Sequence, residues 1–132
     1  MNTKQKVVVA TKEELMEIIK SSKVNANINY LDVSDITDMS DLFANSKFNG
    51  NISKWDVSNV EDMEYMFYNS KFNSDISQWN VNNVTNMEAM FYKSNFTGDI
   101  SQWNVANVTN MAFMFNFSSF NGDISKWVKQ PT

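Results

Sequence analysis

Apolar positions recur with a period of 24 residues along most of this chain. Units at residues 52–75, 76–99 and 100–123 align without insertion or deletion. A looser unit at 28–51 precedes them and a partial unit at 124–132 follows, so we number the full units one to four. A fixed period of this length is typical of repeat proteins, in which each unit buries its apolar face against its neighbours. The pattern therefore predicts one array of stacked repeats.

Within each unit, the spacing of the apolar positions changes along the chain. In unit three, Trp79 and Val81 flank the polar Asn80, and this alternation is typical of a strand. Farther on, Met87 and Phe91 stand four residues apart, a spacing typical of one face of a helix. We therefore predict an α/β solenoid in which each coil contains a parallel strand and a short helix.

The residues before the array have a different pattern. The β-branched run at 7–9 predicts a strand, and Thr11 with Glu14 matches a helix capping box. The apolar residues of the following helix share one face: Leu15, Ile18 and Ile19. We predict a strand and capping helix over residues 1–27, which covers the open end of the repeat array at 28–132.

Equivalent positions of successive units carry similar apolar residues. The tryptophan column is one example: Leu31, Trp55, Trp79, Trp103 and Trp127. Columns of methionine and of phenylalanine run in parallel with it. Such stripes could line a cofactor, but strict recurrence favours packing between stacked units. We therefore predict a continuous core and no cofactor.

The composition narrows the function classes. The chain has no Cys, no His and no Arg, and its net charge is −4. The lack of Cys excludes disulfides and thiolate metal sites, and the lack of His removes the commonest general base. Nucleic-acid backbones bind clustered Lys and Arg, so we expect no nucleic-acid partner. No stretch of the sequence is long and apolar enough to predict membrane insertion.

A carboxylate-based glycosidase is the enzyme class that this composition leaves open. Such an enzyme needs two carboxylates that face each other across a cleft. Asp32 and Asp56 instead stand at equivalent positions of adjacent units, which predicts that they lie side by side on an open surface. We therefore predict that the protein is not an enzyme.

The repeat contains the motif W-[DN]-V-x-[ND]-V-x-[ND]-M-x-x-M-F, followed by F-[NT]-x-D-I-S. This motif resembles the BspA-like bacterial surface proteins, a short class of leucine-rich-repeat protein. The resemblance implies a right-handed leucine-rich-repeat-like coil, and cell-surface or secreted binding and adhesion. It carries over no catalytic residue. The first twenty residues lack the pattern of a signal peptide, so the localisation stays open.

Leucine-rich-repeat folds bind ligands on their concave strand face, so the analogy points to the outward positions of the expected strands. These candidate ligand-binding residues are Tyr30, Asp32, Lys54, Asp56, Gln78, Asn80, Gln102 and Asn104. The resulting face is polar and rich in hydrogen-bonding groups. We expect it to bind a protein or a glycan.

Two polar columns have both a binding and a structural interpretation. Asn59, Asn83 and Asn107 could contact a ligand, but we favour a ladder in which each amide bonds to turn backbone. A second column consists of Asp75, Asp99 and Asp123. These carboxylates could bind Ca²⁺, but we favour turns in which Asp accepts local N–H groups and the preceding Gly supplies a positive φ. We predict no metal site.

Unit four is more apolar than its neighbours. Phe113 and Phe117 stand where unit three has Ala89 and Lys93, and no full unit follows them in this sequence. These rings could fold over the end of the array with Trp127, or they could meet a second copy in a two-fold dimer. We favour the cap, so we predict a monomer with an end-to-end homodimer as the alternative. The alternative function is a structural protein that self-associates through the ends of its array.

Overall fold

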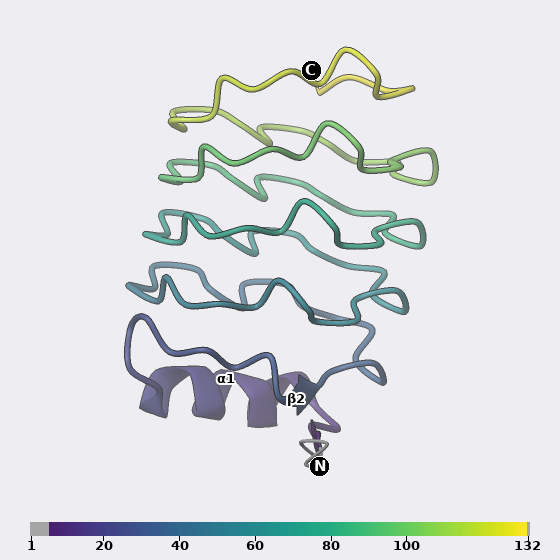
Figure 1. Cartoon of the computed structure of the whole chain (residues 1–132). Coiled ribbons are helices and arrows are strands. Elements are labelled where there is room, and N and C mark those ends of the chain that lie inside the picture. Colours follow the sequence, from purple (N-terminus) through teal and green to yellow (C-terminus); the bar gives the residue numbers. More distant parts are fainter. Residues whose placement is uncertain (1–5, 132) are drawn as a thin grey trace.

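The computed structural model describes residues 6–131. Figure 1 shows a column of successive coils, with the helix across the N-terminal end and the C-terminus at the opposite end. The helices and strands are β1 (Val7–Val8), α1 (Lys12–Ser21) and β2 (Leu31–Asp32). β1 and β2 pair in parallel and join the N-terminal segment to the first coil.

The helix α1 begins where the sequence predicts it. The N–H of Glu14 donates to Oγ1 of Thr11 at 3.1 Å, and this hydrogen bond caps the first turn. Oε1 of Glu14 in return accepts the N–H of Ala10 at 2.9 Å, one residue earlier than in a standard capping box. Leu15 and Ile19 are buried against the first coil, so α1 covers this end of the core as predicted.

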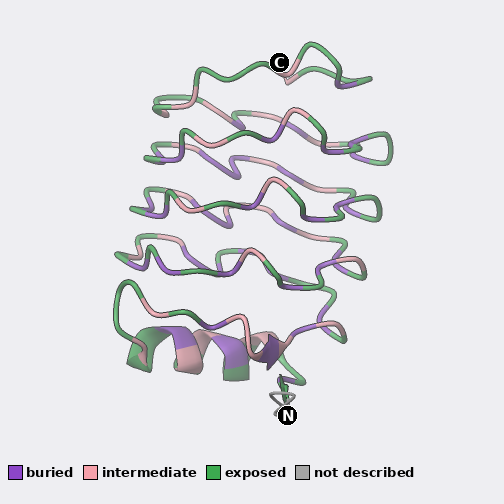
Figure 2. Ribbon diagram, viewed as in Figure 1, coloured by how far each residue is buried: buried purple, intermediate pink, exposed green. Residues whose placement is uncertain are grey.

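Each 24-residue unit makes one coil of the column. Isolated parallel bridges connect equivalent positions of successive coils, from Asp38 to Asp62, then to Asn86 and then to Asn110. Buried and exposed segments alternate along every coil (Figure 2). The repeats therefore stack in register, with one column of equivalent residues above another.

The predicted fold class, an α/β solenoid of parallel strands and short helices, is wrong. Within residues 6–131 the only helix is α1 and the only strands are β1 and β2. The repeats consist of turns, bends and isolated bridges, and no strand or helix recurs from unit to unit. The leucine-rich-repeat geometry implied by the resemblance is therefore absent from the described residues.

Left-handed backbone conformations exclude the expected helix in each unit. Ala89 has a φ of 52° and Lys93 a φ of 58°, whereas an α-helix needs a negative φ throughout. The N–H of Ala89 donates to the carbonyl of Ala112 in the next coil at 2.8 Å, not to a carbonyl four residues earlier. The N–H of Phe91 likewise donates to the carbonyl of Met114 at 2.9 Å. Hydrogen bonds between coils thus replace those of a helix.

The sequence nevertheless predicts which side chains point inward. Trp79 and Val81 are buried and Asn80 is exposed, although the N–H of Trp79 closes a turn with the carbonyl of Ile76 at 3.2 Å. The predicted apolar stripe is also buried, including Met87. The prediction of the inward residues is confirmed, and the secondary structure predicted for them is wrong.

Stacked aromatic rings form the centre of the core. The centroid of Phe91 lies 5.4 Å from that of Phe67 and 5.6 Å from that of Phe115. The tryptophans stack in the same way, and each indole Nε1 donates to an isoleucine carbonyl about 27 residues earlier, at 3.0–3.1 Å. Burying a large apolar side chain contributes about 1.5–3 kcal/mol, so these columns hold the coils together.

Side-chain oxygens shape three corners of each coil. At each corner an Asp or Asn accepts the backbone N–H two residues later, at 2.8–3.0 Å. The three columns are Asn27, Asn51, Asp75, Asp99 and Asp123; Asp32, Asp56, Asn80 and Asn104; and Asp38, Asp62, Asn86 and Asn110. Short polar side chains favour such turns, which explains why Asp and Asn interchange at these positions.

Candidate functional site

The eight residues predicted to bind a ligand lie in two columns along the stack. All of them are exposed or half-buried: Tyr30, Asp32, Lys54, Asp56, Gln78, Asn80, Gln102 and Asn104. In the described part of the chain, the only strand that contributes to this face is β2, so the expected concave strand face is not formed. The columns spread these residues over successive coils and do not gather them around one point.

Half of these residues accept backbone hydrogen bonds that form corners of the coils. Asp32 accepts the N–H and hydroxyl of Ser34, and Asp56 accepts the same groups of Ser58. These hydrogen bonds hold the pKa of both carboxyls below its usual value. Both groups are therefore ionised at neutral pH, with one oxygen committed to the turn.

The asparagine column forms the predicted ladder. Nδ2 of Asn83 donates to the carbonyl of Ser58 at 2.7 Å, and Nδ2 of Asn107 donates to the carbonyl of Asn82 at 2.7 Å. Each amide thus bonds to turn backbone in the preceding coil. The column stabilises the contact between coils, which confirms the structural interpretation.

The aspartate column forms the predicted turns. Asp99 accepts the N–H of Ser101 at 2.9 Å, and this bond and the serine hydroxyl lower the pKa of the carboxyl. The expected role of the glycines is wrong, because no glycine of residues 6–131 has a positive φ. A Cβ at Gly98 would lie 2.7 Å from Cζ of Phe96, so glycine is present to admit the core ring. Among the described residues, no three acidic side chains are arranged to hold a metal ion.

The predicted C-terminal cap is wrong. Trp127 is 4% exposed and stacks on Trp103 with ring centroids 6.5 Å apart, so it extends the core. Phe113 and Phe117 do not fold over it, since their exposed fractions are 52% and 78%. Phe117 instead packs edge-on against Tyr92 at 5.7 Å, on the side of the stack.

A row of aromatic side chains lies on this side of the stack and was predicted only in part from the sequence. We call it the lateral aromatic surface: Tyr65, Tyr68, Tyr92, Phe113 and Phe117. The centroid of Tyr68 lies 5.5 Å from that of Tyr65 and 5.7 Å from that of Tyr92. With Phe117 packed on Tyr92, the row crosses units two, three and four. Only its last two members were noted from the sequence, because the tyrosines fall outside the recurring apolar columns.

Four members of the lateral aromatic surface line a hollow of about 300 Å³: Tyr65, Tyr68, Tyr92 and Phe113. Ala89 occupies in unit three the position that Tyr65 holds one coil earlier and Phe113 one coil later, so this column has no ring between those two. All three residues have a φ between 52° and 60°. Bulky side chains rarely adopt this conformation, which costs about 1–3 kcal/mol per residue. The surrounding hydrogen bonds between coils hold the rings in place.

The hollow lies in a negative environment. Burial raises the pKa of Tyr65 above its usual value, and the carboxylates of Glu88 and Glu64 raise it further. Nζ of Lys93 lies 5.8 Å from the ring centroid of Tyr92, one of the residues that line the hollow. This distance is within the range of a cation–π interaction.

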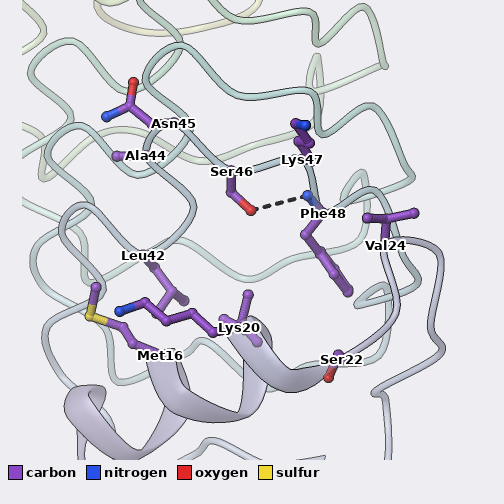
Figure 3. Close-up of a pocket in the computed structure, with 11 residues that line it drawn as sticks. Met16, Lys20, Ser22, Val24, Leu42, Ala44, Asn45, Ser46, Lys47 and Phe48 are labelled. Carbon is purple, nitrogen blue, oxygen red and sulfur yellow. Dashed lines mark hydrogen bonds between the residues drawn. The ribbon is translucent and has the colours of Figure 1, made fainter.

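A second hollow, of about 410 Å³, separates α1 from the first coil (Figure 3). Met16 and Lys20 of α1 lie beside Leu42 across this gap, with Val24 and Phe48 at its other side. This hollow lies at the boundary between α1 and the first coil. Within the described residues, no helix is long and apolar enough to cross a membrane.

Comparison with known proteins identifies a family for the chain. It identifies no relative of known activity. No curated protein and no solved structure matches the chain. The family model described as "Mycoplasma protein of unknown function, DUF285" matches residues 13–127, from the start of α1 to Trp127. The match covers all four full units, so it agrees with a tandem-repeat protein. The chain therefore belongs to the DUF285 family of Mycoplasma proteins of unknown function.

Proposed function

We propose that this protein is a non-enzymatic recognition module that binds a protein or a glycan through its lateral aromatic surface. The observation that carries the proposal is the group of aromatic side chains outside the core, four of which line one hollow. Core rings are accounted for by packing between coils. The lateral rings leave part of their surface uncovered, at a cost in solvation that a bound partner would remove.

Aromatic residues suit this task for physical reasons. Tyrosine has few rotatable bonds, so little side-chain entropy is lost on binding, and its ring and hydroxyl contact apolar and polar groups alike. Tyrosine is also enriched among the residues that dominate binding energy at protein interfaces. Tyr65, Tyr68 and Tyr92 are already held by ring contacts, so they are ordered before a partner arrives.

The chemistry of the chain favours binding over catalysis. Without Cys or His, the acid and the base would have to come from carboxylates, lysines or tyrosines. A glycosidase needs one carboxyl with a raised pKa as the general acid. Asp32 and Asp56 have lowered pKa values and bond to their own turns, which opposes that role.

The resemblance to BspA-like surface proteins supports the same proposal at a finer level. Adhesion by a tandem-repeat module fits an exposed aromatic row on a rigid stack. We propose cell-surface or secreted adhesion as the setting, on the strength of the motif that units two to four share.

Self-association is a second candidate, because Phe117 is 78% exposed and Val128 is also exposed near the C-terminal end. Light scattering across a range of concentrations separates the two candidates. A monomer at all concentrations contradicts self-association. A dimer that Phe117→Lys splits supports it.

The proposed function is tested by an array of glycans and extracellular proteins. The unmodified protein is compared with a Tyr68→Ser/Tyr92→Ser variant and with a matched Gln78→Ser/Gln102→Ser variant on the originally predicted face. We expect binding that the tyrosine changes abolish and the glutamine changes leave intact. Binding lost only in the glutamine variant would contradict the proposal and return the site to that face.

A further inference from the structure

We propose that the hollow of the lateral aromatic surface receives the ammonium group of a lysine side chain from a partner protein. This inference rests on the proposed function, because it names the ligand chemistry of the same surface. It selects a protein over a glycan as the partner.

The hollow, of about 300 Å³, is large enough for one long side chain. Its lining comes from three successive coils: Tyr65 and Tyr68 from unit two, Tyr92 from unit three and Phe113 from unit four. The rings contact one another at different angles, 64° between Tyr65 and Tyr68 and 35° between Tyr68 and Tyr92. A ligand in the hollow therefore meets ring faces and edges from more than one direction. Such aromatic walls are the usual receptors for ammonium groups.

The charges near the hollow favour a cationic ligand over a neutral or anionic one. Three carboxylates act on Tyr65 through space, those of Glu88, Glu64 and Asp41. The N–H of Tyr65 donates to the backbone carbonyl of Glu88 at 2.9 Å, which places this glutamate in the coil directly beside the hollow. Lys93 is a cation beside Tyr92, one of the lining rings. Negative charge beside aromatic faces attracts an ammonium group and repels phosphate or carboxylate ligands.

The two glutamates are also held in place. Oε1 of Glu64 accepts Nδ2 of Asn86 at 3.2 Å, and Oε1 of Glu88 accepts Nδ2 of Asn110 at 3.1 Å. Each carboxylate keeps its second oxygen for another partner in these contacts. The same arrangement in two successive coils gives a fixed negative row along one side of the aromatic rings.

The chain itself shows how this surface receives an ammonium group. Nζ of Lys93 lies 5.8 Å from the ring centroid of Tyr92, in the geometry expected of a cation–π contact. A partner lysine in the hollow would use the neighbouring rings. Lys93 would then compete with it and repel it, so removal of Lys93 should strengthen binding.

The test uses two capped peptides, acetyl-Gly-Lys-Gly-amide and its norleucine counterpart, which lacks the charge. Binding is followed by NMR through the ring resonances of the tyrosines. We expect the lysine peptide to bind roughly fivefold more tightly than the norleucine peptide. Glu88→Gln should weaken lysine binding about two- to fivefold, and Lys93→Ala should strengthen it by a similar factor.

Ala89→Tyr is the decisive variant, because Ala89 holds the position between Tyr65 and Phe113 in their column, where we expect a tyrosine ring to extend into the hollow, and no aromatic residue is removed. Tyr65 already occupies the equivalent position with a φ of 59°, so the backbone at Ala89, with a φ of 52°, accepts a tyrosine. We expect loss of lysine-peptide binding with retained folding, measured by the dispersion of the NMR spectrum. Ala112→Tyr, next to the site in sequence but outside the hollow lining, is the matched control and should bind normally.

Equal binding of the two peptides, or full binding by Ala89→Tyr, would overturn the lysine inference. So would displacement of a captured partner by a neutral oligosaccharide and not by the lysine peptide. These failures are distinct from failure of the proposed function. If array binding depends on Tyr68 and Tyr92 but the lysine peptide does not bind, only the lysine inference is wrong. If array binding does not depend on these tyrosines, the proposed function is wrong.

Discussion

Phe91 and Tyr92 are neighbours in the chain and lie in different environments. Phe91 is fully buried, with its ring stacked between Phe67 and Phe115 in a column that runs through every coil. Tyr92 is half-buried and takes part in a row that has no counterpart in unit one. Strict recurrence of a residue thus marks packing in this protein. Departure from recurrence marks the surface on which we place recognition.

The largest expected effect on stability is that of Met90→Asp, which places a charge in the core. Met90 is fully buried, and an unpaired carboxylate there costs several kcal/mol. Because each coil is stabilised by its neighbours, much of the array should unfold with unit three. Thermal melting by circular dichroism measures the effect, with the exposed Asn95→Asp as control. A melting temperature within a few degrees of the parent would contradict the burial of this column.

The second prediction compares the two neighbours directly. Phe91→Ala should reduce the free energy of unfolding by about 3–5 kcal/mol, because it leaves a cavity in the stacked column. Tyr92→Ala should cost about 1 kcal/mol or less, because the ring is partly in solvent. Urea titration of both variants gives the difference. Equal losses would show that the lateral row is part of the core.

A smaller effect is expected from Trp103→Phe, which keeps an aromatic ring and removes one hydrogen bond. The indole Nε1 donates to the carbonyl of Ile76 at 3.1 Å in a buried site. The carbonyl of Ile76 still accepts the N–H of Trp79, so the loss of one hydrogen bond should cost about 0.5–1.5 kcal/mol, in addition to the change in ring size. Urea titration measures the loss. No change in stability would mean that the indole ladder only follows the packing.

The smallest effect concerns pH and the corners. The pKa of Asp99 is below its usual value of 3.8 in the folded protein, because the N–H and hydroxyl of Ser101 bond to the carboxylate. A carboxyl with a lowered pKa stabilises the fold at pH values above its pKa in the unfolded chain. This contribution disappears as the pH falls through the pKa of the folded state. Melting curves should therefore show a decline below about pH 4.

Asp99→Asn is the matched variant for this prediction. Asn51 forms the same corner in the first unit, where its Oδ1 accepts the N–H of Ser53 at 3.0 Å. The variant should keep the corner and show a slightly weaker decline in melting temperature at low pH. An identical decline in parent and variant would assign the acid sensitivity to other carboxylates.

Much of the fold could be predicted from one sequence because the same residues recur. The buried columns, the helix cap at Thr11 and the asparagine ladder all follow from local chemistry repeated at a fixed interval. The type of secondary structure could not be predicted, because a helix and a series of turns both place Met87 and Phe91 inside. The backbone at Ala89 forms a turn, because its N–H donates to the carbonyl of Ala112 in the next coil.

The candidate site could be predicted only in part. Phe113 and Phe117 were noted as departures from the repeat, but their position on the side of the stack was not. The hollow combines residues from three coils, and no local pattern in one unit describes it.

The period, the inward columns and the residues that form the corners follow from the sequence alone. These depend on side-chain chemistry within one unit or at equivalent positions of adjacent units. Two features arise only when the coils stack: turns replace the expected helices, and Tyr65, Tyr92 and Phe113 meet around one hollow. Buried backbone N–H groups need hydrogen-bond partners, and those of Ala89 and Phe91 bond to carbonyls of the next unit, which only the stacking of the coils brings within reach.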